Sequence, residues 1–200
     1  MNRLEFAEVA WHMKKRLTEM TSEELWKLFP IFLVPHNEQW VEYYNEMHKF
    51  LRRILSEYQI RRISHIGSTA VKNIWSKNII DILIEIDFDE DMEDVSKEIE
   101  RNGFIRMSSD INRFSLNRGY TESGFEEKVY HIHLRRLGDN DELYFRDYLN
   151  EHSEIAKEYE RLKLDLWKQY EHNRDGYTDA KSNFITKQTL AAKKLYANRY

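Results

Sequence analysis

Two kinds of hydrophobic spacing divide the chain. From Asn37 to Leu55 apolar residues recur every three or four positions, which predicts a helix with a wide apolar face that Asn37 can cap. At 60–66 the period changes to that of a short strand, and at 79–86 the sequence I-I-D-I-L-I-E-I is almost wholly apolar. A strand this apolar is usually covered on both faces of its sheet. The pattern therefore predicts a buried sheet flanked by helices.

Capping residues, glycine and proline predict the ends of the other elements. Thr21 and Glu24 have capping-box spacing, so the first segment is expected to be helical up to Phe29 and to stop at Pro30. A helix from about Asp91 to Asn102 should end at Gly103, and helices are also expected at 144–150, 153–170 and, after a loop at 173–177, about 179–196. Strands are expected at 104–107, 113–117 and 129–135, the last two as an antiparallel pair around a loop with Gly119 and Gly124.

Length and composition narrow the class of protein. Two hundred residues, 41% of them hydrophobic, suit one α+β domain with a mixed sheet and one sizeable core. We expect a core at 31–140, a helical extension at 1–30 and C-terminal helices at 141–200. The 14% aromatic content argues for a folded chain, and the absence of cysteine excludes disulfides, thiolate zinc sites and a cysteine nucleophile.

Charge and hydropathy restrict partners and location. The 31 Lys and Arg against 35 Asp and Glu give a net charge of −4, which argues against general binding to nucleic acids or anionic membranes. No apolar run approaches the roughly 18 residues of a membrane span, and residues 1–6 lack the apolar stretch of a signal peptide. We therefore expect a cytoplasmic protein without a membrane partner.

The stretch from Ser64 to Glu85 has the residues of an anion site. A strand runs into Gly67, and Ser68 and Thr69 are expected to open a helix whose first N–H groups, with the two hydroxyls, can bind an anionic oxygen. A plain N-cap and turn would use the same residues. Asp81 is a lone carboxylate in an apolar strand, so it needs a metal ion or an ion pair, for example with Arg113 or Lys77.

Five ordered motifs carry a family resemblance over about residues 35–185. They are H-I-G-S-T-A-V at 65–71 with K-N-I-I-D-I at 77–82, the segment 34–40 ending in Trp40, H-I-H at 131–133, F-R-D-Y-L at 145–149, and Tyr177 with Lys181 and Phe184. Together they resemble the GrpB family, an uncharacterised group within the DNA polymerase beta-like nucleotidyltransferase superfamily.

The resemblance implies a nucleotidyltransferase-like fold and a mechanism. In that superfamily a Gly-Ser turn holds nucleotide phosphates, strand carboxylates hold Mg²⁺, and a nucleoside monophosphate group is transferred while pyrophosphate leaves. By position Gly67 and Ser68 match the phosphate turn, and Asp81 matches the first metal-binding carboxylate. The second carboxylate is replaced by Leu83. Glu85 shares the strand face of Asp81 but lies about 13 Å from it, so we expect it at the strand end, facing solvent.

His131 and His133 could replace the missing second carboxylate. They share one strand face, where imidazoles could serve as metal ligands, His133 above all, or as a general base. The alternative is a polar, partly solvated face opposite Arg113, Ser115 and Asn117. His65 is expected to be a hydrogen-bonded structural residue.

The remaining candidate phosphate contacts are basic or aromatic, namely Lys77, Arg113, Arg146, Tyr177 and Lys181. Other basic residues, such as Lys163 and Lys187, are expected on the solvated surface. Trp11, Leu17, Trp26 and Phe29 of the extension should pack onto the core, or form a homodimer interface.

The leading functional hypothesis is therefore a protein that binds a nucleoside triphosphate with Mg²⁺ at Gly67–Thr69 and Asp81, and that could transfer a nucleotidyl group to an unknown small molecule or protein. Asp81, His131 and His133 are its candidate catalytic residues. One alternative is a non-catalytic nucleotide- or metabolite-binding or partner-stabilising module with a degenerate metal site. Another is a hydrolase whose transition metal is held by both histidines and Asp81.

Overall fold

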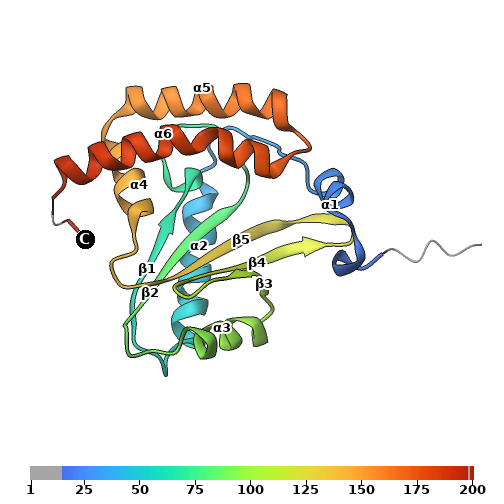
Figure 1. Ribbon diagram of the computed structural model, residues 1–200, viewed down its shortest axis with the longest axis vertical. Coiled ribbons are helices and arrows are strands. Elements are labelled where there is room, and N and C mark those ends of the chain that lie inside the picture. Colours follow the sequence, from blue (N-terminus) through green and yellow to red (C-terminus); the bar gives the residue numbers. More distant parts are fainter. Residues whose placement is uncertain (1–14, 198) are drawn as a thin grey trace, which may run out of the picture.

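A five-stranded mixed sheet runs through the middle of the molecule (Figure 1). The computed structural model describes residues 15–197 and 199–200. The strand order is β1-β2-β5-β4-β3, and neighbouring strands are antiparallel except for the parallel pair β2 and β5. The strands are β1 (Ile60–Ile66), β2 (Ile80–Ile86), β3 (Ile105–Ser109), β4 (Arg113–Thr121) and β5 (Gly124–Arg136). The helices are α1 (Ser22–Leu28), α2 (Gln39–Ile54), α3 (Met92–Arg101), α4 (Asp141–Glu151), α5 (Ser153–Tyr170) and α6 (Arg174–Leu195).

Helices cover both faces of β2, the second strand of the sheet. The isoleucines at 80, 82, 84 and 86 are buried against α2 and α3 in the largest hydrophobic cluster. On the other face Leu83 packs with Ile66 and with Leu143 of α4. Helices α5 and α6 lie side by side beyond α4 (Figure 1). The predicted α+β fold with a mixed sheet, and the double covering of this strand, are confirmed.

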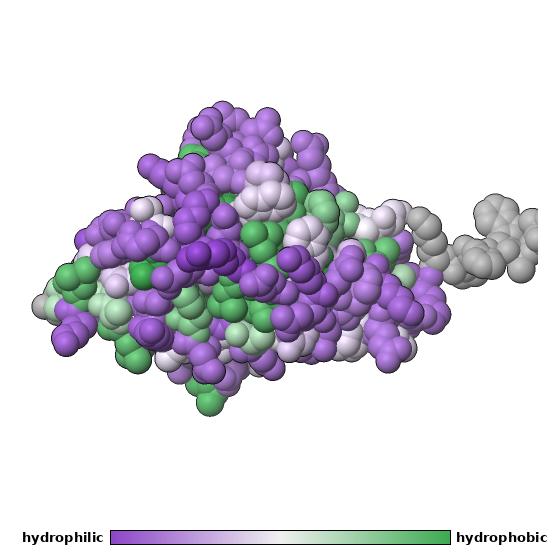
Figure 2. Space-filling view, turned by 90° about the horizontal axis from the view of Figure 1, so that it is seen from above, coloured by the Kyte–Doolittle hydropathy of each residue, from purple (hydrophilic) through white to green (hydrophobic). Residues whose placement is uncertain are grey.

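One face of the molecule shows the polarity of its surface. The face seen in Figure 2 is largely hydrophilic, with smaller hydrophobic areas among the polar residues. None of the helices in the described part of the chain is long and apolar enough to cross a bilayer.

Several predicted elements are confirmed near their expected ends. Thr21 and Glu24 form the reciprocal capping box at the start of α1, and α3 ends just before Gly103, whose φ is +91°. The expected helical segment up to Phe29 is resolved from residue 15 as a 3-10 turn at Leu17–Glu19 followed by α1. Residues 1–14, which include Trp11, lie outside the described residues.

Two predicted loops are wrong. Gly119 and Gly124 lie inside β4 and β5, not in a loop between them. The register of the pair shifts around Gly119, and a Cβ atom there would lie 2.5 Å from the carbonyl oxygen of Lys128, so this glycine marks a bulge. The loop expected at 173–177 is also absent, because the Asn173 side chain accepts the Gly176 N–H at 2.9 Å and caps α6 there.

Glu85 is buried, contrary to the expected solvent-facing position. Its side chain pairs with Arg62 of β1 at 3.0 Å and accepts hydrogen bonds from the Gly138 N–H and the Asn140 side chain, both at 2.9 Å. Its exposed fraction is 0% because the segment after β5 covers this end of β2. Glu85 therefore joins β1, β2 and the start of α4.

We predict that Glu85→Ala lowers the free energy of unfolding by about 3 kcal/mol, because it leaves Arg62 and two amide donors without their acceptor. Urea denaturation of both proteins measures the change. The matched control is Glu42→Ala, on the exposed face of α2, which should change stability by less than about 0.5 kcal/mol. Similar losses in the two variants would contradict this role for Glu85.

Candidate functional site

The site begins where β1 ends against β2. Ile66 is paired with Asp81 in the antiparallel register, so the next residue, Gly67, reaches the Asp81 side chain. Gly67 has φ of +71°, and a Cβ atom there would lie 2.9 Å from Asp81 Cβ and Cγ, and closer still to Oδ2. Only glycine allows both this backbone conformation and this close approach.

The turn after Gly67 is shorter than expected. Ser68–Ala70 form a single 3-10 turn, so the predicted helix with its row of free N–H groups is wrong. The Thr69 hydroxyl is buried, donates to the Ile79 carbonyl at 3.0 Å and contacts His65 Nε2 at 3.0 Å. Thr69 therefore holds the turn against the start of β2, and both Ser68 and Thr69 line the cavity described below. His65 is hydrogen-bonded, as predicted, and burial lowers its pKa to about 4.

The parallel pairing of β2 and β5 brings the two candidate histidines to Asp81. Asp81 is opposite His131, and Leu83 is opposite His133. His131 Nδ1 and His133 Nε2 each lie 3.4 Å from Asp81 Oδ1. Burial alone would raise the pKa of Asp81, but hydrogen bonds from both imidazoles outweigh burial and hold it well below its usual range. The carboxylate is therefore ionised.

Hydrogen bonds to the far side of each ring indicate its tautomer. Arg135 approaches His133 Nδ1 at 3.3 Å and can only donate, so the ring hydrogen of His133 is on Nε2 and faces Asp81. His131 Nε2 lies 2.7 Å from the Tyr120 hydroxyl, which in turn accepts from Arg174 at 3.1 Å. Burial lowers the pKa of His131, so this ring is neutral and directs Nδ1–H toward Asp81.

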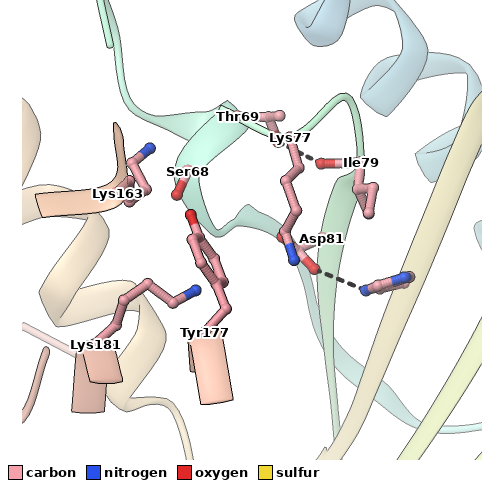
Figure 3. A pocket seen from close by; sticks show the side chains of 9 residues that line it. Ser68, Thr69, Lys77, Ile79, Asp81, Lys163, Tyr177 and Lys181 are labelled. Atoms are coloured by element: carbon pink, nitrogen blue, oxygen red, sulfur yellow. Dashed lines mark hydrogen bonds and ion pairs between the residues drawn. The ribbon is translucent and has the colours of Figure 1, made fainter. Parts of the chain in front are cut away.

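Beside Asp81 lies a cavity in two parts. An inner recess of about 50 Å³ is lined by nine residues, among which Asp81 is the one carboxylate (Figure 3). It shares Ser68, Lys77 and Lys181, together with Asp81 and His131, with an outer cleft of about 560 Å³. The cleft has apolar side chains such as Phe145, Ile185 and Leu190 on its walls and Asp141 and Glu142 among its polar residues.

Three lysines surround the recess. Lys77 precedes β2, Lys163 comes from α5 and Lys181 from α6. Burial lowers the pKa of Lys77 to about 7, of Lys163 to about 7 and of Lys181 to about 8. Repulsion by Lys181 adds to the effect at Lys77 and Lys163, and repulsion by Arg174 adds to it at Lys181. Lysines with such low pKa values have too little negative charge near them. An anion bound between them would raise their pKa values and so keep the amines protonated.

Tyr177 is packed among these amines with an unsatisfied hydroxyl. Lys181 Nζ and Lys77 Nζ lie 4.2 Å and 5.3 Å from the centre of its ring. The residue is 1% exposed, and its oxygen has no hydrogen-bond partner within the described residues. In Figure 3 the hydroxyl points toward Ser68. A buried hydroxyl left unpaired costs about 1–3 kcal/mol, so this one is suited to meet a ligand oxygen or water.

The structure brings most of the predicted residues together, but not all. The predicted residues that surround the recess and the cleft are Gly67, Ser68, Thr69, Lys77, Asp81, His131, His133, Tyr177 and Lys181. Arg113 lies on the cleft, where Asp139 holds its guanidinium at 2.7 Å, and no ion pair joins Asp81 to Arg113 or Lys77 in the described chain. Arg146 lines neither space: it donates to the His65 carbonyl at 2.8 Å and pairs with Asp147.

Two basic lining residues were not predicted as site residues from the sequence. Lys163 was expected on the surface, yet it is 2% exposed and donates to the Trp75 carbonyl. Arg174 lines the cleft and holds Tyr120. Helix α5 is rich in both acidic and basic residues, so the sequence alone does not distinguish a buried lysine from its solvated neighbours. Arg174, at the first position of α6, could have been found from the Asn173 cap.

Comparison with sequences identifies relatives of the chain. A family model described as GrpB protein matches residues 30–190. The glutamate-rich protein GrpB of Alkalihalophilus pseudofirmus is 32% identical over 160 residues, which are 78% of this chain and 91% of that protein. The UPF0157 protein YqkA of Bacillus subtilis is 31% identical over 76% of this chain, which covers only 44% of YqkA.

Comparison with solved structures agrees with the sequence comparison. The conserved protein GrpB from Enterococcus faecalis superposes with a TM-score of 0.69 at 31% identity, over 82% of this chain and 99% of that one. A weaker likeness, with a TM-score of 0.49 at 9% identity, is to Cid1 in complex with the UTP analog UMPNPP, over 80% of this chain and 50% of that one.

We predict that Gly67→Ala destabilises the protein more than Gly103→Ala does. Both residues have positive φ, so both substitutions carry the left-handed strain of about 1 kcal/mol, but nothing lies within 4 Å of a Cβ at Gly103. The methyl group at 67 must in addition displace the Asp81 carboxylate, at a further cost of at least about 1 kcal/mol. Equal losses in urea denaturation would show that the contact between Gly67 and Asp81 is unimportant.

Proposed function

The chain belongs to the GrpB family, as its motifs predicted, and from the site that its fold assembles we propose that it binds a nucleoside triphosphate. The phosphates would lie at Ser68, Lys77 and Lys181, with Lys163 and the Tyr177 hydroxyl at the inner end. The nucleoside would occupy the outer cleft.

The charge of the recess carries this proposal. Three lysines and one carboxylate, that of Asp81, line the recess, and this carboxylate already interacts with two imidazoles. A triphosphate brings several negative charges and many acceptor oxygens to such a place. The cleft volume of about 560 Å³ is within the range of small-molecule sites, and the side chains of Phe145, Ile185 and Leu190 offer apolar surface to a base or sugar.

The donor set does not fit a protein-held Mg²⁺. This ion prefers oxygen ligands in octahedral geometry, whereas Asp81 is the one carboxylate at the recess and its neighbours are imidazoles. Asp81 Oδ1 faces both rings, Oδ2 lies against Gly67, and Leu83 is buried at the position of the second carboxylate. Within the described chain no group of three His, Asp or Glu could hold a metal. The lysines would therefore neutralise the phosphates, and the same donor set does not favour a hydrolase with a histidine-bound metal.

Nucleotidyl transfer is a second candidate function, favoured by the convergence of Asp81, His131 and His133 beside the Gly67 turn. An acceptor hydroxyl would attack the α-phosphorus, the bond to the leaving pyrophosphate would break, and the proton would pass to the Tyr120 hydroxyl as that hydroxyl gives its own proton to Nε2 of neutral His131. Leu83 favours the non-catalytic alternative, in which binding alone is the function.

We predict that Lys181→Met weakens the binding of a nucleoside triphosphate at least about tenfold, because a charge-assisted hydrogen bond contributes roughly 1.5–3 kcal/mol. Isothermal titration calorimetry with ATP, GTP, CTP and UTP in EDTA measures the dissociation constants without added metal. Lys187→Met, an exposed lysine on the same helix, is the matched control and should change them less than about twofold. A wild-type protein that binds none of the four, or equal losses in both variants, would contradict the proposal.

A further inference from the structure

A second cavity lies next to this site, between the N-terminal segment and the sheet. It has a volume of about 580 Å³, and we call it the α1 groove. Leu17, Leu25 and Trp26 form one wall, and Ile105 and Met107 of the edge strand β3 form the other. Phe29 and Tyr120 close its inner end, with ring centres 4.8 Å apart.

The apolar walls are open to solvent. Ile105 is 52% and Met107 is 59% exposed, on a strand at the edge of the sheet. Exposed apolar side chains that face further apolar residues across a groove of this size are typical of a small-molecule site.

The groove carries a cation that has no counter-ion among the described residues. Arg174 is half-buried and donates to the Tyr120 hydroxyl at 3.1 Å, and no ion pair of Arg174 is found in the described chain. The other guanidinium on the groove, Arg106, is neutralised by Glu93 at 2.7 Å and Glu100 at 2.6 Å. Asp175, the carboxylate among the lining residues, is exposed. The remaining N–H groups of Arg174 are therefore suited to a ligand carboxylate.

We propose that the α1 groove binds a small molecule with an apolar body and a carboxylate head, the body between Trp26 and Met107 and the head on Arg174. The family model begins at residue 30, so the lining residues from Leu17 to Phe29 lie outside the matched region. The groove is thus built partly by residues that the family match does not include. This proposal does not depend on nucleotide binding, although Arg174 and Thr178 border both spaces.

The fluorescent probe 1-anilinonaphthalene-8-sulfonate, which joins an aromatic body to an anionic head, tests the site in the protein of residues 1–200. We expect Met107→Glu to weaken probe binding at least tenfold, because it places a carboxylate on the apolar wall. Phe88→Glu is the matched control: Phe88 is 67% exposed on the loop after β2, away from the groove, and its replacement should leave the dissociation constant unchanged. Lys181→Met should also leave it unchanged, which excludes binding at the lysine recess.

Competition tests the anionic head. Decanoate should displace the probe at a lower concentration than decanol in the wild type, and Arg174→Gln should abolish the difference. Equal effects of Met107→Glu and Phe88→Glu, a comparable loss in Lys181→Met, or equal competition by decanoate and decanol in the wild type would each overturn the proposal. Circular dichroism confirms that every variant is folded.

Discussion

The contact between Gly67 and the Asp81 carboxylate is the constraint on which the site depends. Because Gly67 lacks a side chain and adopts a left-handed conformation, β1 can end directly against β2 and leave Ser68 at the cavity. The parallel partner β5 then presents His131 and His133 to the opposite carboxylate oxygen. Neighbouring strands thus fix Asp81 from two sides. Its single negative charge balances only part of the positive charge of the lysines around the recess.

The C-terminal helices supply that charge. Lys163 from α5 and Lys181 from α6 line the recess. Tyr177 lies beside them, and its hydroxyl has no hydrogen-bond partner in the part of the chain that the structure describes. Unfolded lysine titrates near 10.5, but in the folded chain these groups titrate near 7 to 8. Below about pH 7 they are charged in both states, so the folded protein carries the full cost of their repulsion and burial. That cost begins to fall once the pH exceeds about 7 to 8, where the folded state releases these protons, and it is gone above about 10.5, where the unfolded state has released them too. A bound anion would reduce the cost at lower pH.

Local patterns predicted the sheet and much of the site, whereas long-range packing decided the rest. The apolar strand 79–86 and the alternation at 129–135 were enough to place Asp81, His131 and His133 on strands, and the parallel register brought them together. Glu85 was misplaced because its burial depends on residues 138–140, which fold over the end of β2. The inward position of Lys163 follows from the packing of α5, and Arg146 is occupied by the His65 carbonyl of a distant strand. Neither contact has a local sequence pattern.

The central claim is that the recess is an anion site whose lysines are incompletely compensated. NMR titration of the side-chain Cε and Hε signals of Lys77, Lys163 and Lys181, with and without inorganic tripolyphosphate, tests it most directly. Without the anion we predict that the three lysines titrate near pH 7 to 8, well below the usual value of 10.5. With tripolyphosphate their pKa values should rise, because each ammonium gains an anionic partner. Lysines that titrate normally without the anion, or whose pKa values do not move when it is added, would contradict the account.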